Sequence, residues 1–514
     1  MTNISLSRRV WLLVSFVSMV LGLTPVAASG ADRQITVPSA IGGIIGAQNG
    51  IGFAHEGTVG LVLGVSTGGP THLVSFVVSD AMVANDLILD DFPPPTPSRS
   101  TAFGMSVNDQ SGLAAIFGNG ANETQIVAGV SADANGKLTR RWAVSHPNPN
   151  GGQAEAAVNA DGSIVYFFYN DSSPKVDKIR AEDGVLLATV QLDAVDIEAG
   201  LTFNPVLKRL IVKTGLTNFF HVFRPEPDFA VDWMVRAPID FGLLKRGFIS
   251  GDGQFFIGYG GFGGSTDGGS LGNHFLTLDL ITRELHTVLL EGRLAPSGVA
   301  LTFAPSLATL IVPYSSTVKV RKNGLSGCAC GTQVVDWLSL GSDGALTHQF
   351  TTKLAGDQQI IGPLNNAALS RTSAIAFLAT DTKRLVAVDT LTGEVVSDQQ
   401  VGDVFFIYRI GNTDTFLTTN GTNVLRLLDL NTGPSISGVT IKKRRLIIEG
   451  ENFLAGARVQ INGQDIGIAT RSSDNPGREI ILDRGKKDLP EGQDVIVTVI
   501  NRDGLRSKPF TVAR

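Results

Sequence analysis

The sequence predicts an all-β protein, and three observations support this. Of its 514 residues, 43% are hydrophobic and only 17% are charged, and there are 59 glycines. This composition suits short apolar strands joined by tight turns, because helical surfaces usually carry more Glu, Lys and Arg. After the first thirty residues, no stretch shows sustained helical periodicity. Apolar segments of strand length recur instead, separated by turn-forming pairs such as Asp161-Gly162 and Asp343-Gly344.

Residues 1–30 have the pattern of an export signal. Arg8 and Arg9 form a basic region, Val10–Leu23 an apolar segment, and Val26–Ala28 a cleavage context of small residues. The alternative is an anchoring transmembrane helix, but this apolar run is shorter than the roughly 20 residues that span a bilayer. We therefore expect a signal peptide that is removed from the mature protein.

Because of this signal, we expect a protein that is secreted into an extracellular or periplasmic compartment. No further apolar stretch reaches membrane-spanning length, so no transmembrane segment is expected after signal cleavage. The formal net charge of −5 gives no electrostatic reason to expect nucleic acid as a partner. A protein or glycan ligand at the cell surface and a monomeric state are the expectations.

The only two cysteines, Cys328 and Cys330, are two positions apart. An exported protein of this size therefore does not depend on a disulfide framework. A local bridge or a pair of free thiols is the simpler interpretation, because two thiolates alone leave a metal under-coordinated. The sequence leaves the choice between bridge and free thiols open.

Internal repeats indicate a β-propeller. Residues 199–213 align with residues 299–313, and both segments hold a short strand, a Pro-centred turn and a second apolar strand. Related units begin near Phe103, Ala156, Gly247 and Ala367. Their spacing, mostly about 45 to 55 residues, is within the range of a four-stranded blade.

A third strand that ends in a turn recurs within several units. It is seen in Phe275–Arg283, Leu385–Gly393 and Val424–Gly433, each with an Asp at the strand end and a Thr shortly after it. Asp and Thr can bond their own backbone, and a glycine takes a positive φ, so a hairpin turn is expected.

Seven or eight units can be counted, and the last, Phe405–Leu430, supplies only three strands. A propeller must close its ring, so we predict that an early strand around Gln34–Pro38 completes this last blade.

These units resemble the blades of the YVTN-like bacterial propellers, with Val388–Val396 as the best match. The resemblance covers roughly residues 35–432, and the propeller domain is expected to span residues 31–432. It implies a seven- or eight-bladed β-propeller, but its motifs specify the fold far better than an activity.

From residue 433 the pattern changes. A Gly-x-Asn-Phe turn at Gly450–Phe453 precedes a Val-x-Ile-Asn-Gly strand and hairpin at Val459–Gly463. This resembles an IPT/TIG domain, which implies an immunoglobulin-like β-sandwich over residues 433–514. Independently, Val495–Ile500 is an apolar run that predicts a strand packed on both faces or at a sandwich core.

Local motifs with catalytic associations lack the required context. Gly64–Gly68 matches a serine nucleophile elbow, but Gly69-Pro70 follows and leads into another strand instead of a helix. Gly258–Gly263 matches a dinucleotide fingerprint, but a glycine-rich loop follows it. The basic run Lys442–Arg445 is expected to be a solvated turn between the first strands of the terminal domain.

Two functions remain. The first is a non-enzymatic binding or structural protein that uses a propeller face to hold a protein, glycan or surface ligand, with the terminal module as spacer or second contact. The alternative is a lactonase-like hydrolase whose active site lies in the axial channel, where Asp80, Asp193, Asp196, Glu198 and His274 are examples of groups that could converge. We assign no catalytic, cofactor or metal residues. Convergent carboxylate or imidazole groups at the axis favour the enzyme, and an axis of small and apolar residues favours binding.

Overall fold

The computed structural model confirms an all-β fold for the residues that it describes. It describes residues 32–38, 43–44, 50–65, 69–92, 102–120, 123–148, 154–171, 173–193, 199–214, 219–237, 247–260, 273–290, 302–304, 308–314, 334–355, 358, 367–402, 404, 406–420, 423–442, 445–482, 489 and 492–513. Within these ranges the regular structure consists of strands and contains no helix.

The described strands up to Asp429 form eight antiparallel sheets, each a meander of neighbouring strands. The first sheet contains β2 (Gly43–Ile44), β3 (Ile51–Ala54), β4 (Val59–Val65), β5 (Thr71–Val77) and β6 (Met82–Leu89), and the second contains β7 (Ala102–Val107), β8 (Leu113–Gly120), β9 (Thr124–Ala132) and β10 (Leu138–Pro147). The third sheet contains β11 (Glu155–Val158), β12 (Ile164–Asn170), β13 (Pro174–Arg180) and β14 (Leu186–Gln191). The fourth contains β15 (Ala199–Asn204), β16 (Arg209–Thr214), β17 (Phe219–Arg224) and β18 (Ala230–Arg236).

The other four sheets follow the same plan. They contain β19 (Gly247–Ile249), β20 (Phe255–Gly260), β21 (Asn273–Asp279) and β22 (Leu285–Leu290); β23 (Thr302–Ala304), β24 (Thr309–Tyr314), β25 (Val334–Leu340) and β26 (Leu346–Lys353); β27 (Ala367–Leu369), β28 (Ile375–Ala379), β29 (Arg384–Asp389) and β30 (Val395–Gln400); and β31 (Phe406–Arg409), β32 (Thr415–Thr419) and β33 (Val424–Asp429) with β1 (Asp32–Thr36).

The first strand of the chain completes the last of these sheets. β1 pairs antiparallel with β33, with Gln34 opposite Arg426. The Arg426 guanidinium also forms an ion pair with Asp32. This confirms the predicted closure, with the strand two residues earlier than expected.

Hydrophobic contacts between the sheets make the arrangement a closed β-propeller. The middle strands of each sheet are buried on both faces, as in β12 and β28. Eight clusters of buried apolar residues each join two neighbouring sheets. One of them joins Leu417 and Leu425 of the last sheet to Val62 and Val74 of the first. Because the clusters link each sheet to the next and the last to the first, the core is a ring.

The two ends of the sheets differ. We call the end that holds the first-to-second and third-to-fourth strand connections the turn end, and the opposite end the loop end. Turn-end connections are short, for example residues 390–394 between β29 and β30. Loop-end connections include residues 261–272 between β20 and β21 and residues 315–333 between β24 and β25. These two segments lie outside the described residues.

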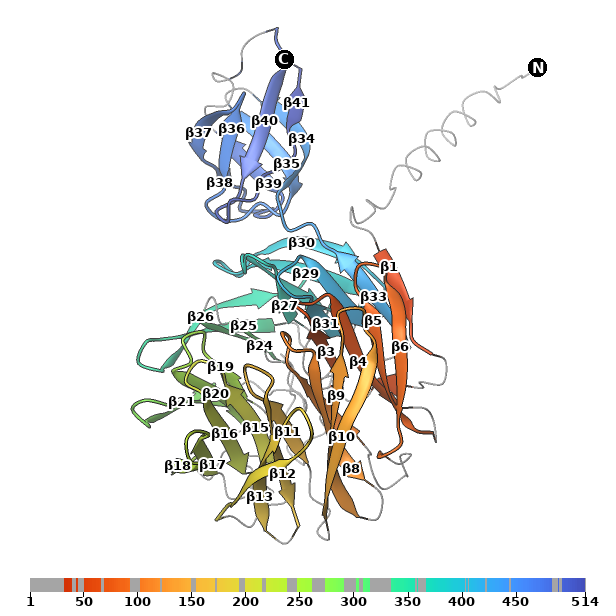
Figure 1. The fold of residues 1–514 in the computed structure, drawn as a ribbon. Helices are drawn as coiled ribbons and strands as arrows, with labels where there is room; N and C mark the ends of the chain where they lie inside the picture. The colour runs from red at the N-terminus through yellow and green to blue at the C-terminus, as the bar shows by residue number, and fades with distance from the viewer. Residues whose placement is uncertain are drawn as a thin grey trace, which may run out of the picture.

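The C-terminal module, residues 435–512, consists of two more sheets. One is β34 (Ser435–Lys442), β35 (Arg445–Glu451), β39 (Glu479–Leu482) and β38 (Thr470–Arg471); the other is β37 (Gln464–Ile468), β36 (Arg458–Ile461), β40 (Val495–Ile500) and β41 (Phe510–Val512). Both sheets pack on one hydrophobic cluster of their own. Figure 1 shows the module beside β29 and β30 of the propeller.

Two sequence predictions about this module can be compared with the structure. Lys442 and Arg445, the first and last residues of the basic run, are paired across β34 and β35, as expected for a run that connects the first strands of the module, and residues 443–444 lie outside the described residues. In β40, Val495, Val497 and Val499 are buried whereas Ile496 is 46% exposed. The strand therefore packs by one face against the module core, and the two-faced alternative is wrong.

Candidate functional site

The axis of the propeller is lined mainly by small and apolar residues. The first strands of neighbouring sheets contact one another, which places them on the inside of the ring. Among the described residues of these strands, Glu155 in β11 and Arg409 in β31 are the only charged ones. Arg409 donates a hydrogen bond from Nη1 to the carbonyl of Ser370, 3.1 Å away. The described axis therefore presents no converging set of carboxylates or imidazoles.

The polar residues suggested for an axial active site are not brought together. Asp80 is exposed in the turn between β5 and β6 at the turn end, and Asp193 is exposed just after β14 at the loop end. His274 lies in β21, opposite Gly260 of β20. Asp196 and Glu198 lie outside the described residues. Asp80 and Asp193 thus cannot share one site at the axis.

The remaining candidate motifs are only partly described. Gly64 lies inside β4 and Gly258 inside β20, and the later residues of both motifs fall outside the described residues. Cys328 and Cys330 also lie outside them. In the described part of the chain, no three His, Cys, Asp or Glu residues are placed to hold a metal ion. Nor does that part contain a helix long and apolar enough to span a membrane.

A buried His–Asp pair between two sheets was not foreseen. His146 near the end of β10 and Asp177 in β13 approach to 2.8 Å between Nε2 and Oδ2. The Asp177 side chain is 0% exposed. Its other oxygen accepts a hydrogen bond of 2.6 Å from the Thr189 hydroxyl of β14. The contact with His146 is short but lacks hydrogen-bond alignment, so it is an ion pair only when the imidazole is protonated.

Tyr169 completes this cluster. Its ring stacks on the His146 imidazole with 3.8 Å between centroids and 7° between planes. Burial raises the pKa of the Tyr169 hydroxyl, and the negative charges of Asp177 and Asp171 raise it further. The hydroxyl therefore stays protonated and donates a long hydrogen bond of 3.4 Å to Asp177 Oδ1. The cluster binds two sheets together and holds an imidazole beside a buried carboxylate.

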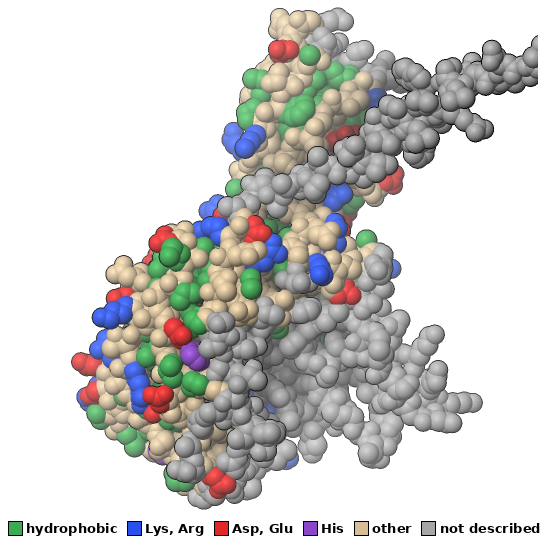
Figure 2. All heavy atoms as spheres, turned by 90° about the vertical axis from the view of Figure 1, so that its right-hand side faces the viewer, with side chains coloured by type: hydrophobic (Ala, Val, Ile, Leu, Met, Phe, Trp, Pro, Cys, Tyr) green, Lys and Arg blue, Asp and Glu red, His purple; other side chains and the backbone are tan. Residues whose placement is uncertain are grey.

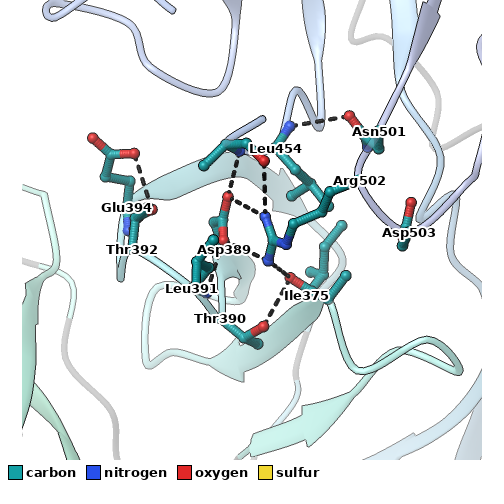
Figure 3. Close-up of polar contacts among 12 residues, drawn as sticks. Ile375, Asp389, Thr390, Leu391, Thr392, Glu394, Leu454, Asn501, Arg502 and Asp503 are labelled. Carbon is teal, nitrogen blue, oxygen red and sulfur yellow. Dashed lines mark hydrogen bonds and ion pairs between the residues drawn. The ribbon is translucent and has the colours of Figure 1, made fainter. Parts of the chain in front are cut away.

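The most extensive polar site of the described residues joins the propeller to the C-terminal module (Figure 3). Its centre is Asp389, which ends β29 and is 0% exposed. Arg502 of the module contacts both carboxylate oxygens at 2.8 Å, so the pair is bidentate. The backbone N–H of Ala455 donates to Asp389 Oδ2 at 2.8 Å. A module that supplies three donors to one buried carboxylate is docked there, not merely tethered.

A second charge pair flanks this centre. Arg471 of the module forms an ion pair with Glu394, which follows the turn after β29. The same guanidinium lies 3.7 Å from Asp389. Arg502 also donates to the carbonyl of Ala374 at 3.3 Å. Two cations thus face two carboxylates of a single propeller turn.

The Gly450–Phe453 turn supplies the apolar and backbone part of the junction. Asn452 has a positive φ of 57° and donates from Nδ2 to the carbonyl of Asn431 in the linker, at 2.8 Å. Phe453 packs into the module core. Leu454, the next residue, is fully buried in a propeller cluster between the last two sheets. The motif quoted for the IPT/TIG resemblance is therefore the segment that contacts the propeller.

No protein-family model matches the chain, and no curated protein matches its sequence. Solved structures resemble it in fold. The β-propeller domain of Cps50 (Swd1) from Myceliophteria thermophila is 11% identical, with a TM-score of 0.41 over 77% of this chain and 98% of that one. BamB from Moraxella catarrhalis is 12% identical, with a TM-score of 0.43 over 78% and 97%. Kuenenia stuttgartiensis hydrazine synthase is 12% identical, with a TM-score of 0.42 over 65% and 96%. The propeller assignment rests on the strand pairing and the inter-sheet clusters.

Proposed function

We propose that this chain is an exported binding protein. In this proposal residues 1–30 are a cleaved signal peptide, and the eight sheets of residues 31–432 are eight blades of a YVTN-like propeller. Residues 433–514 are an IPT/TIG module with an immunoglobulin-like sandwich. The support is the ring of inter-sheet clusters, the closing strand β1 and the two-sheet module with its own core.

The function we propose is non-enzymatic binding of a protein, glycan or surface ligand by the loop end of the propeller. The observation that carries it is the axis, whose described strands carry only Glu155 and Arg409 as charged residues. The docked module contacts the turn end at Asp389 and Glu394. The loop end, with its long connections, is left for a ligand, since binding residues concentrate on loops held by a rigid scaffold.

Surface charge agrees with a partner other than nucleic acid. Figure 2 shows Lys and Arg interspersed with Asp and Glu over the propeller face in view, without a large patch of one sign. The net charge of −5 is also modest for a chain of this length. Affinity for nucleic acid requires a basic surface that releases counterions. We therefore propose a partner other than nucleic acid. We also propose that the exported protein is an extracellular or periplasmic monomer.

Export and function can be tested separately. The N-terminal sequence of the protein purified from its own cells should begin near residue 30, and fractionation should place it outside the cytoplasm. The purified mature protein is then analysed for bound metal and screened by thermal shift with metal ions, sugars and lactones. It is also applied to a glycan array.

The outcomes separate the two functions. Binding to a glycan or surface protein without turnover supports the proposal, and replacement of Asp193, which is exposed at the loop end, tests the face. A stoichiometric metal together with lactone hydrolysis overturns it in favour of the alternative, a lactonase-like propeller enzyme.

A further inference from the structure

Three of the third strands in the propeller end in the same way. Asp279, Asp389 and Asp429 each end the third strand of a sheet, and each is paired with the first residue of the second strand. The next residue along donates its N–H to the carbonyl of the residue before that second strand, at 2.8, 3.1 and 3.1 Å respectively. The three aspartates are therefore structurally equivalent, yet only Asp389 binds the C-terminal module.

The residue before the second strand differs among the three. In the β19–β22 sheet it is Gln254, whose Nε2 donates to Asp279 Oδ2 at 2.7 Å. In the last sheet it is Asp414, whose oxygens accept from the Arg371 backbone at 2.7 Å and from the Thr432 hydroxyl at 3.0 Å. In the β27–β30 sheet it is Ala374, which has no polar side chain. The Asp389 carboxylate is therefore left open to an outside donor.

We infer that the module carries a carboxylate-binding site, formed by Arg502, Arg471 and the N–H of Ala455, whose ligand is an acidic β-turn with an open Asp and a Glu five residues later. Ala374 is the residue that makes one propeller turn fit this site. Arg502 meets the carboxylate with both of its terminal nitrogens, a geometry that selects planar carboxylates.

The linker alone does not account for the choice of turn. Residues 430–434 join β33 to β34, so the module can reach the two sheets that flank the last one. These are the β27–β30 sheet and the β2–β6 sheet, which shares a hydrophobic cluster with the last sheet. At the equivalent position the β2–β6 sheet has Val77, opposite Val59. Of the two sheets within reach, only the β27–β30 sheet has a carboxylate at this strand-end position.

The test is the Ala374→Gln variant of the full chain. By analogy with Gln254, the new side chain should donate to Asp389 and exclude Arg502. We expect the module to detach, with cleavage of the 430–434 linker by a protease of broad specificity rising at least about tenfold. Small-angle scattering should show a larger radius of gyration. Circular dichroism of the variant checks that the propeller is folded.

Two further variants keep the test decisive. Gln254→Ala makes the opposite exchange in a sheet that carries no module, and it should leave linker cleavage unchanged. Arg502→Gln should detach the module, whereas Arg458→Gln, which removes an ion pair to Asp465 on the module surface, should not. If Ala374→Gln and Arg502→Gln both cleave at the wild-type rate, the inference is overturned and the linker alone positions the module. This outcome would leave the proposed ligand binding at the loop end intact.

Discussion

The turns that follow β21 and β29 have the same backbone hydrogen bonds, but only the turn after β29 contacts the C-terminal module. In each, the Asp N–H bonds the carbonyl of a Glu five residues on, at 2.9 Å in both cases. In each, the Asp side chain accepts from the N–H two residues later, at 2.7 Å for Asp279 and 2.9 Å for Asp389. Ile281 in the first turn and the equivalent Leu391 in the second are both exposed, but only the second turn carries the C-terminal module, so we call the first the solvent-facing turn. The turn backbone is therefore a repeat property, and docking depends on a few side chains around it.

The largest expected effect comes from the apolar contact that the solvent-facing turn lacks. Leu454 is 0% exposed and packs among residues of the last two sheets. Leu454→Ala should destabilise the docked module by about 2–5 kcal/mol, because it removes a buried side chain and leaves a cavity. Urea unfolding of the full chain measures this. Ile468→Ala on the module surface, where the side chain is 73% exposed, should change stability by less than about 0.5 kcal/mol. Equal effects of the two variants would contradict the docking.

A second prediction concerns the close approach of the two backbones. A Cβ on Gly477 would overlap the Cα of Val396, the second residue of β30. Gly477→Ala should therefore weaken docking by about 1–3 kcal/mol through overpacking. Gly438→Ala is the matched control, because a Cβ there meets only ordinary contacts within the module. Linker proteolysis should rise for Gly477→Ala and not for Gly438→Ala. If the control also detaches the module, strain inside the module is the cause.

The third prediction tests the solvent-facing turn itself. Burial alone would raise the pKa of Asp279, but hydrogen bonds from Thr282, Gln254 and Ile281 outweigh it and hold the pKa below its ordinary 3.8. This carboxylate therefore stabilises the fold above pH 3.8, and the stabilisation is lost as the pH falls through the lowered folded-state value. Asp279→Ala should cost about 1.5–3 kcal/mol at pH 7, the range for hydrogen bonds to a charged group.

The pH dependence of Asp279→Ala provides the measurement. Urea midpoints at pH 7, 5 and 3 should show the gap between wild type and Asp279→Ala shrinking at the lowest pH. Asp279→Asn keeps an acceptor oxygen but has no group that titrates at this position. The stability of this variant should therefore vary less between pH 5 and 3 than that of the wild type. A gap that widens at pH 3 would mean that the pKa is raised, contrary to the hydrogen-bond geometry.

Much of this turn could be read from the sequence, because its determinants are local. The Asp at the strand end, the Thr after it and the glycine at Gly393 with a φ of 74° act within six residues. The closing strand was also predictable, since an incomplete last unit requires a partner. Its pairing through Gln34 and Arg426 follows from that requirement.

The docking site could not be predicted, because its parts are far apart in the chain. Arg502 meets Asp389 across 113 residues, and the effect of Ala374 depends on the absence of a polar side chain. Similarly, His146 and Asp177 come from two different sheets. Sequence spacing gives no position within a ring, so it does not reveal that Asp80 and Asp193 lie at opposite ends of the sheets. A repeat pattern predicts each blade but not what meets between blades.

The smallest expected effect lies at the position where the two turns differ in residue type. Arg283 has a φ of 69° where the docked turn has Gly393. Its guanidinium lies 5.6 Å from the centre of the Trp233 ring. Arg283→Ala and Arg283→Gly both remove this cation–π contact, and they differ only in the Cβ at a left-handed position. The glycine variant should be more stable than the alanine variant by about 1 kcal/mol. Thermal unfolding of the two variants measures the difference. Equal stability of the two variants would show that the turn after β21 accepts a Cβ at a positive φ. The glycine at position 393 would then be explained by the close approach of Phe350 and not by its φ angle.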